Sequence, residues 1–234
     1  MYWILTSFAT PILFAILIVF DKKLLSEYIP SAKTFFFLIG FFQIVAAGLV
    51  FVLTPWDSPT SLLMLSASIG SGIVWALGLI LMLNALKYLD ASRVTNVYHT
   101  YPIFVALLAI ILLKEYLSVY QYLAIIITVL GAGLAGIDNA SKNPLRGTLP
   151  IYALVVIGSF LTAVAMVTWK YALTEMDFWN IFALRSVGLG AVLMGLGYHK
   201  NIVLETRLIL SNKPALALFV VAEIFFAPIA MVVM

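Results

Sequence analysis

Six stretches of the sequence contain no aspartate, glutamate, lysine or arginine over 20 or more residues. They cover residues 1–20, 34–56, 58–86, 94–113, 116–137 and 147–169. Charged residues make up only 10% of the 234 residues, whereas ordinary soluble domains contain roughly 25%. A helix needs about 20 predominantly apolar residues to cross the hydrocarbon core of a bilayer. The sequence therefore predicts an all-α integral membrane protein.

Two further stretches contain a single charge each and bring the expected number of transmembrane helices to eight. Residues 178–198 are interrupted by Arg185, and residues 214–234 are interrupted by Glu223. The apolar runs are continuous and do not alternate with period two, which favours helices over the strands of a membrane barrel. The first stretch has neither a basic segment before it nor a small-residue cleavage site after it. We therefore expect a retained span, not a signal peptide.

An internal repeat appears when the sequence is shifted by 148 residues. Residues 12–27 then align with residues 160–175 at six identical positions of sixteen, including Lys22 with Lys170 and Glu27 with Glu175. These charged identities are informative because charges are scarce here. They predict a first five-helix repeat over residues 1–138 and a second over residues 147–234 with three helices. Repeats of five spans lie in opposite orientations, so we expect part of a ten-helix, five-plus-five inverted repeat whose second copy is incomplete.

Residues 84–115 carry an ordered set of features that resembles a known family. An alanine-leucine-tyrosine segment is followed by a polar turn, a central proline and a closing glutamate: Ala85, Leu86, Tyr88, Asp90, Pro102 and Glu115. This set resembles the third-to-fourth span region of EamA-type transporters in the drug/metabolite transporter superfamily, and the glycine-rich residues 131–136 are similar to the fifth span. The resemblance implies a ten-helix carrier coupled to protons or another gradient, with a central cavity.

The expected function is export of small metabolites or drugs by alternating access in the plasma (inner) membrane. The expected partners are the lipid bilayer, an unidentified small-molecule substrate and a coupling proton or cation. No cofactor, metal or nucleic acid is expected, because the basic residues are scattered singly, no metal-ligand cluster is evident and cysteine is absent. Enzyme motifs such as HExxH, GxSxG and the P-loop are also missing. A membrane-embedded enzyme and a non-transporting scaffold or receptor stay open as alternatives.

Ionisable residues within a span are costly, and they usually face a cavity or a partner. Glu223 is preceded by nine uncharged residues and followed by eleven. It is therefore a candidate for proton coupling and for substrate binding. The alternative is a structural salt bridge, for example to Arg185 or Lys170. Membrane orientation stays open, because the loop charges disagree with the cytoplasmic N-terminus expected from the family.

Polar residues and a proline interrupt the candidate span 94–113. On a regular helix Asn96, His99 and Thr100 share one face, and Tyr98 lies opposite. Pro102 removes a backbone hydrogen bond and is expected to kink the helix, which frees a carbonyl near Tyr98 for a substrate. His99 is a second candidate for proton coupling, with a merely hydrogen-bonded histidine as the alternative. The cavity-lining candidates from this span are Asn96, Tyr98, His99, Tyr101 and Pro102.

Two tryptophans complete the predicted site. Trp75 is expected to point towards the cavity, and Trp169 either lines it or belongs to the interfacial aromatic belt beside Lys170. Arg185 is expected to form a structural pairing. Small residues four apart, as in Ser68, Gly72 and Ala76, are expected to pack helices within the chain, although a homodimer through such faces is possible.

Overall fold

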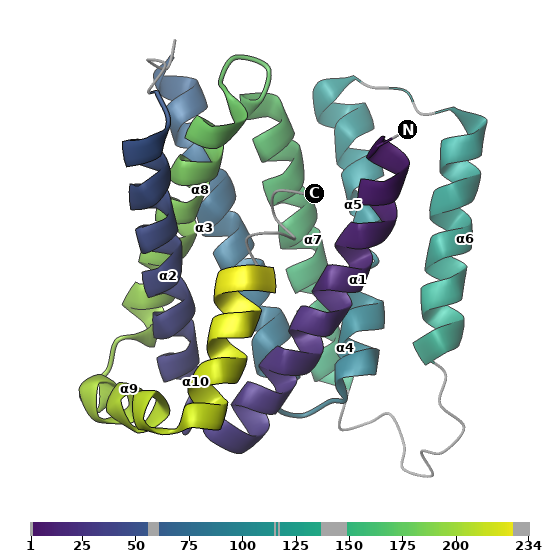
Figure 1. Cartoon of the computed structure of the whole chain (residues 1–234). Helices are drawn as coiled ribbons and strands as arrows, with labels where there is room; N and C mark the ends of the chain where they lie inside the picture. The colour runs from purple at the N-terminus through teal and green to yellow at the C-terminus, as the bar shows by residue number, and fades with distance from the viewer. Residues whose placement is uncertain (1, 56–60, 115, 117, 137–148, 227–234) are drawn as a thin grey trace. The chain divides into compact units, whose positions relative to one another are not determined.

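A computed structural model describes residues 2–55, 61–114, 116, 118–136 and 149–226. Every regular element in this part of the chain is a helix, which confirms the all-α prediction (Figure 1). The α-helices are α1 (Tyr2–Lys23), α2 (Ala32–Leu53), α3 (Leu62–Ala85), α4 (Ala91–Tyr98), α5 (Tyr101–Leu108), α6 (Val119–Gly136), α7 (Leu149–Ala172), α8 (Phe178–Gly197), α9 (Ile202–Ser211) and α10 (Lys213–Phe219). The π-helical segments are η1 (Leu24–Tyr28), η2 (Ala109–Leu113) and η3 (Val220–Phe226).

Five helices of the described residues are long and apolar enough to cross a membrane. They are Ala32–Leu53, Leu62–Ala85, Ala91–Leu113, Leu149–Ala172 and Phe178–Gly197. Each overlaps one of the eight predicted spans. The predicted span 1–20 overlaps α1, and the predicted span 116–137 overlaps α6, which has 18 residues. The last predicted span, 214–234, ends outside the described residues. The chain is thus a helical membrane protein, and the count of eight stays a prediction.

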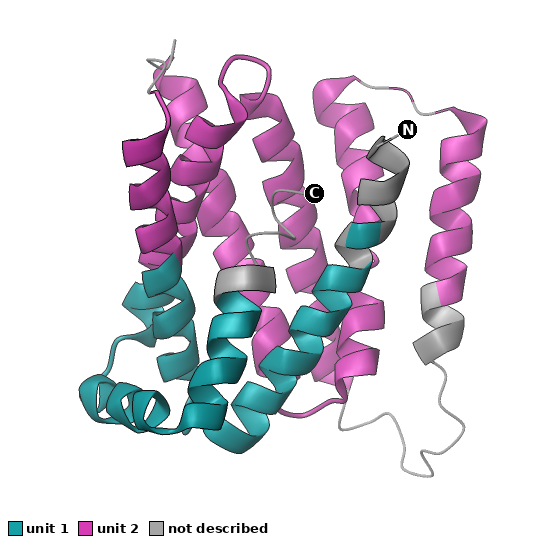
Figure 2. Cartoon of the chain, in the orientation of Figure 1, with its two compact units in different colours: residues 1–42, 193–234 teal, residues 43–192 magenta. Residues whose placement is uncertain are grey.

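The chain divides into two compact units, which are described separately (Figure 2). The first unit comprises residues 1–42 and 193–234, and the second comprises residues 43–192. The predicted repeat boundary lies within the second unit, at residues 138–147.

Close backbone contacts between helices hold the second unit together. A Cβ atom added to Gly78 on α3 would lie 2.8 Å from the carbonyl oxygen of Gly158 on α7, and the reverse distance is 2.9 Å. A Cβ atom on Gly72 would lie only 2.0 Å from the carbonyl oxygen of Arg185 on α8. Ser68 and Ala76, one turn to either side of Gly72, are buried. This stripe of α3 therefore packs within the chain, as predicted.

The predicted kink near Pro102 is confirmed as a break between α4 and α5. His99 and Thr100 lie between the two helices, and Pro102 occupies the first turn of α5. The prediction that Tyr98 and Thr100 face opposite sides is wrong. Because the chain turns at the break, both residues contact α7: the Tyr98 hydroxyl lies 2.6 Å from Thr162 Oγ1, and Thr100 Oγ1 lies 3.3 Å from Ser159 Oγ.

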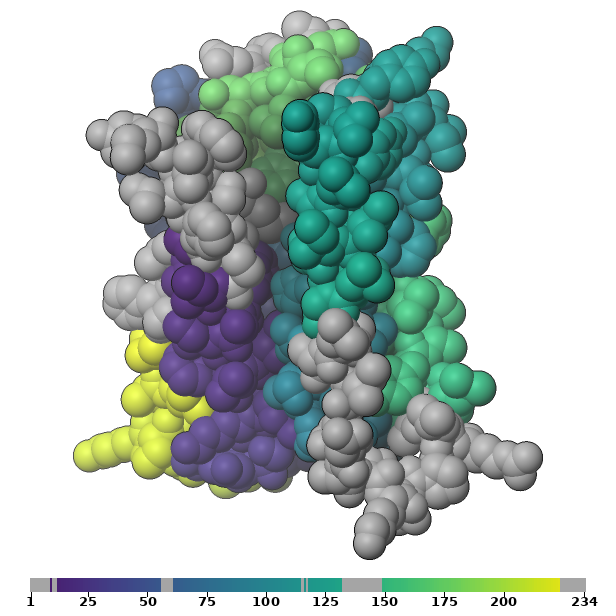
Figure 3. Space-filling model, turned by 90° about the vertical axis from the view of Figure 1, so that its right-hand side faces the viewer, coloured from purple at the N-terminus to yellow at the C-terminus, as the bar shows by residue number. Residues whose placement is uncertain are grey.

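Helix α6 belongs to the second unit, where it contacts α4 and α5. It stands as a teal column at the front of the space-filling view (Figure 3). Large apolar side chains are exposed along it: Tyr120, Ile126, Ile127 and Leu130. In a membrane such side chains face lipid at no cost, because lipid tails are as apolar as the side chains.

A polar cluster in the first unit joins the start of α2 to α9. Glu205 on α9 accepts hydrogen bonds from Thr34 and, at 2.7 Å, from Ser31. His199 Nε2 lies 3.2 Å from Glu205 Oε1, and its Nδ1 lies 3.0 Å from the carbonyl oxygen of Gly197. Hydrogen bonds to the Gly197 carbonyl and to Glu205 raise the pKa of His199. Hydrogen bonds from Thr34 and then Ser31 lower the pKa of Glu205.

This cluster is expected to make the stability of the chain depend on pH. A raised pKa means that the contribution of protonated His199 is present below its usual value of 6.5 and is lost as the pH rises through its folded pKa. The contribution of Glu205 is present above its usual value of 4.5 and is lost as the pH falls through its lowered pKa. Thermal unfolding in detergent should therefore show greatest stability between these two pKa values.

The variant His199→Gln keeps a hydrogen-bonding side chain but cannot take up a proton. The variant should not lose stability as the pH rises, and it should still lose stability as the pH falls. An unchanged alkaline slope in this variant would show that other groups cause it.

Candidate functional site

Arg185 lies at the centre of the most distinctive side-chain arrangement in the second unit. Its guanidinium carbon Cζ lies over the rings of both Trp75 on α3 and Trp169 on α7, 4.2 Å from each ring centroid. All three side chains are buried, with exposed fractions of 4% for Arg185 and 6% for each tryptophan. Cation–π attraction of this kind is strongest where water is excluded. The structure thus brings two predicted cavity residues together around Arg185.

The guanidinium has tryptophan faces as neighbours, and two of its three nitrogens have no hydrogen-bond acceptor. Its Nε and Nη2 atoms are buried without a hydrogen-bond partner, and so is Nε1 of Trp169. No described carboxylate of this unit lies within ion-pair distance of Arg185. The Tyr98 hydroxyl is close enough to interact with the Trp75 indole and, electrostatically, with the Arg185 guanidinium. Three N–H donors of this arrangement are therefore buried without a partner, and an oxygen acceptor is what they lack.

The hydroxyls of α7 extend this site towards the break between α4 and α5. Thr162 pairs with Tyr98, and Ser159 pairs with Thr100. The two residues lie three positions apart, so they occupy the same face of α7. The sequence prediction missed them. Their signal was a pair of hydroxyl residues at helical spacing within an apolar span.

The remaining candidates from the kinked span lie beside the break. The His99 ring centroid is 5.8 Å from the centroids of both Tyr98 and Tyr101. His99 and Tyr101 are half-buried, as are Asn96 and Pro102. The structure thus groups His99 with two tyrosines, whereas Asn96 lies one turn earlier on α4.

Glu223 belongs to the first unit, where it meets another acid. The Asp21 and Glu223 side chains lie within hydrogen-bonding reach of each other, and their exposed fractions are 4% and 7%. Asp21 Oδ1 is buried without a hydrogen-bond partner. Asp21 lies in the last turn of α1, which contacts η3, the π-helical segment that carries Glu223. Because π-helical segments often occur at functional sites, this placement is a second reason to examine Glu223.

The sequence prediction missed Asp21 as the partner of Glu223. The partners considered for Glu223 are Arg185 and Lys170, and Asp21 lies just outside the predicted span 1–20. The signal was available: Asp21 directly follows 20 uncharged residues, and α1 continues through it to Lys23.

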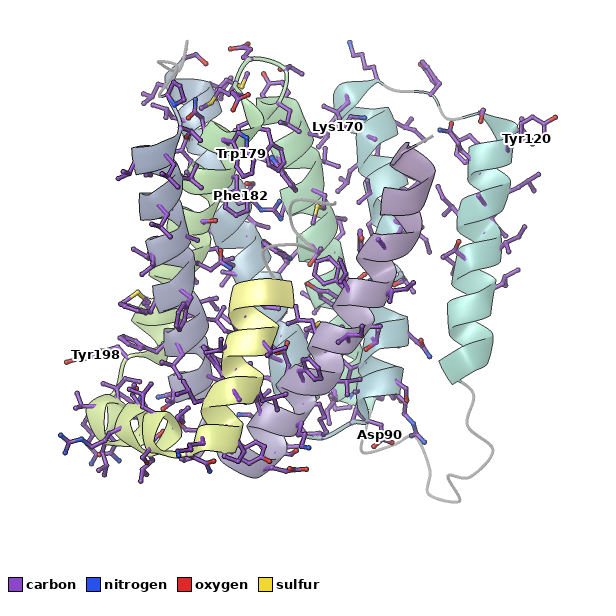
Figure 4. The ribbon with its side chains drawn as sticks, in the orientation of Figure 1. Asp90, Tyr120, Lys170, Trp179, Phe182 and Tyr198 are labelled. Atoms are coloured by element: carbon purple, nitrogen blue, oxygen red, sulfur yellow. The ribbon has the colours of Figure 1, made fainter. Side chains whose placement is uncertain are left out.

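An aromatic cluster surrounds the turn between α7 and α8 in the second unit. Trp169 lies 5.9 Å from Phe178, and Phe178 lies 6.3 Å from Phe182, measured between ring centroids. Figure 4 labels Phe182, Trp179 and Lys170 near this end of the two helices. Lys170 is exposed, whereas its neighbour Trp169 is buried. Trp169 is therefore a packed residue of the arginine site.

Metal binding has no support in the part of the chain that the structure describes, because no group of three or more possible ligands occurs there.

Comparison with protein families gives one match. Residues 1–137 match the model of a family described as the EamA-like transporter family. The match covers more than half of the chain and includes Asp21, Trp75 and the kinked helix. Trp169, Arg185 and Glu223 lie beyond the matched residues. No curated protein matches the chain.

Proposed function

Because the chain belongs to the EamA-like transporter family, we propose that it exports small metabolites or drugs as a secondary transporter. The family supports a membrane location, and we assign the plasma (inner) membrane. Transport proceeds by alternating access around a central cavity. The two repeats, residues 1–138 and 147–234, supply the opposed halves that such a cycle needs.

The observation that carries this proposal is the buried pair of Asp21 and Glu223. Two carboxyl groups can form a hydrogen bond only when a proton lies between them. In an apolar environment a second negative charge at the same place is strongly disfavoured. The pair therefore holds one proton and can release it when the site opens to water or when a cationic group arrives. His99, in the second unit, is a second candidate for proton coupling.

The substrate path is lined by the aromatic and polar residues that the sequence predicted. They are Trp75, Asn96, Tyr98, His99, Tyr101, Pro102 and Trp169, with Glu223 at the coupling site. Support comes from the contacts of two of them, since Trp75 and Trp169 both lie against the buried guanidinium of Arg185. Aromatic rings with a few polar groups are the usual lining of small-molecule sites.

Reconstitution of the full chain in liposomes tests this function. A pH-sensitive dye inside the vesicles reports proton movement when amino acids, amines, nucleosides or aromatic drugs are added outside. We expect at least one compound to move protons at a rate above that of protein-free vesicles, and a protonophore to abolish the effect. Product formation without flux would instead indicate an enzyme. Absence of both flux and product would indicate a scaffold or receptor.

A further inference from the structure

We propose that Arg185, between Trp75 and Trp169, binds the carboxylate of a singly charged organic anion. As the substrate site of a transporter, it rests on the function proposed above. The arrangement itself depends only on contacts within the second unit, which holds all three residues.

The open donors of Arg185 define the shape of the ligand group. Nε and Nη2 lie on the same edge of the planar guanidinium, and both are buried without a partner. Two parallel N–H groups on one edge match the two oxygens of a carboxylate or the paired oxygens of a phosphate. Trp169 Nε1 adds a third unpaired donor on a ring that already contacts the guanidinium. All three groups donate, so the missing partner is an oxygen acceptor, and the positive charge of Arg185 favours an oxyanion.

The charge balance favours a carboxylate over a phosphate. Arg185 provides one positive charge, and the rings of Trp75 and Trp169 are neutral. A carboxylate neutralises that charge, whereas a doubly charged phosphate would leave one negative charge in an apolar place. No described carboxylate of the unit lies within ion-pair distance of Arg185, so none competes for the site.

The backbone around Arg185 is held in place before any ligand arrives. The Arg185 carbonyl lies where a side chain on Gly72 would have to be, so α3 and α8 touch directly at this position. Further along the same pair of helices, a Cβ atom on Gly188 would lie 2.2 Å from the carbonyl oxygen of Ile69. Such close contact fixes the start of the arginine side chain, and the two indoles restrict its end. A site with little freedom left to lose binds its ligand at a lower entropic cost.

A purely structural role for Arg185 explains the same burial less completely. Packing alone would be served by an apolar side chain, and a structural arginine normally satisfies its N–H groups with carbonyls or carboxylates. Here the two indole rings stabilise the positive charge of Arg185 in part. The Nε and Nη2 donors on one edge of the guanidinium still have no acceptor.

Four ligands with the same ring and different head groups distinguish these roles. They are phenylacetate, phenylacetamide, phenethylamine and phenyl phosphate, each added to the full chain in detergent at up to about 10 mM. The measurement is the midpoint of thermal unfolding, followed by tryptophan fluorescence, because a ligand of the folded state raises it. We expect phenylacetate to raise the midpoint in a saturable way and phenylacetamide and phenethylamine to leave it unchanged. Equal effects of phenylacetate and phenylacetamide would overturn the proposal, and tighter binding of phenyl phosphate would overturn the choice of a carboxylate.

Variants of Arg185 locate the site. Arg185→Gln should weaken phenylacetate binding by roughly 100-fold, because the charge and the paired donors are both lost. Arg185→Lys keeps the charge but not the planar edge, and a loss of roughly tenfold is expected. Arg207→Gln, the same change at an exposed arginine on α9, should bind as the original chain does. If Arg185→Gln does not fold, Arg185→Lys and the comparison of the four ligands still test whether Arg185 binds a carboxylate.

The outcome for this site is separate from the outcome for transport. Binding of phenylacetate that depends on Arg185 would support the site even if no flux occurs in liposomes. Undiminished binding in both Arg185 variants would overturn the site and leave proton-coupled flux of other compounds unaffected.

Discussion

Replacement of Gly72 by alanine is expected to lower the stability of the folded chain by about 1–3 kcal/mol, the usual cost of forcing extra atoms into a packed core. The added methyl group would lie 2.0 Å from the Arg185 carbonyl oxygen and 2.8 Å from the Leu189 nitrogen. Both are backbone atoms, so the clash cannot be relieved by rotating a side chain, and α3 and α8 must separate. Thermal unfolding in detergent measures the loss, and phenylacetate binding at Arg185 should weaken with it.

Gly70→Ala is the matched control for this change. It alters the same helix two residues earlier, where an added Cβ atom has nothing within 4 Å. Because alanine favours a helix over glycine, the control should be neutral or slightly more stable. Equal destabilisation by both substitutions would show that flexibility of α3, and not its contact with α8, determines the effect.

Replacement of Glu223 by glutamine is expected to reduce substrate-driven proton movement to the rate of protein-free liposomes. The amide has nearly the shape of the acid and can still hydrogen-bond to Asp21, but it carries no exchangeable acidic proton. Asp21→Asn should have the same effect, because in the proposed mechanism the two residues share a single proton. The dye assay in liposomes measures both variants.

Glu27→Gln provides the control for charge. Glu27 is an exposed acid in η1, close in sequence to Asp21, and its loss should leave proton movement unchanged. Full proton movement in both Glu223→Gln and Asp21→Asn would contradict the coupling role of the pair. Loss of proton movement in Glu223→Gln alone would instead show that Glu223 carries the proton without the help of Asp21.

The fold class was predictable because lipid imposes a simple rule on the sequence. Every backbone polar group must be paired within the chain, so a charge-free run of about 20 residues becomes a helix. Four of the five candidate spans begin and end within a few residues of such runs, and the fifth, Phe178–Gly197, contains the single charge of Arg185. The kink was also predictable, because Pro102 removes a hydrogen-bond donor wherever it stands in a helix.

The direction of side chains around the kink was not predictable. Helical spacing assigns a face to each residue only while the helix continues. Residues after the two-residue break no longer follow the spacing of the residues before it. Tyr98 and Thr100 therefore meet the same helix although regular spacing would separate them. The spacing of small residues also does not predict which of them pack closely against another helix. The stripe at Gly72 is buried between helices, whereas a Cβ atom on Gly131 or Gly195 would have no described atom within 4 Å.

The partners of isolated charges were harder still to predict. Arg185 and Glu223 are recognisable in the sequence as charges within apolar spans. Whether each meets an opposite charge, a ring or a like charge depends on contacts between distant segments. Glu223 meets Asp21, which lies 202 positions away in the sequence, and Arg185 meets two tryptophans from different helices.

The break between α4 and α5 has a consequence for how this span can bend. A continuous helix resists bending because backbone hydrogen bonds of a whole turn must open together. Here that ladder is already interrupted at His99 and Thr100, and the Thr100–Ser159 contact holds the break itself to α7. Exchanging one such hydrogen bond for another partner costs only about 1 kcal/mol. A change in the angle between the two halves of the span would therefore require no helix to unravel.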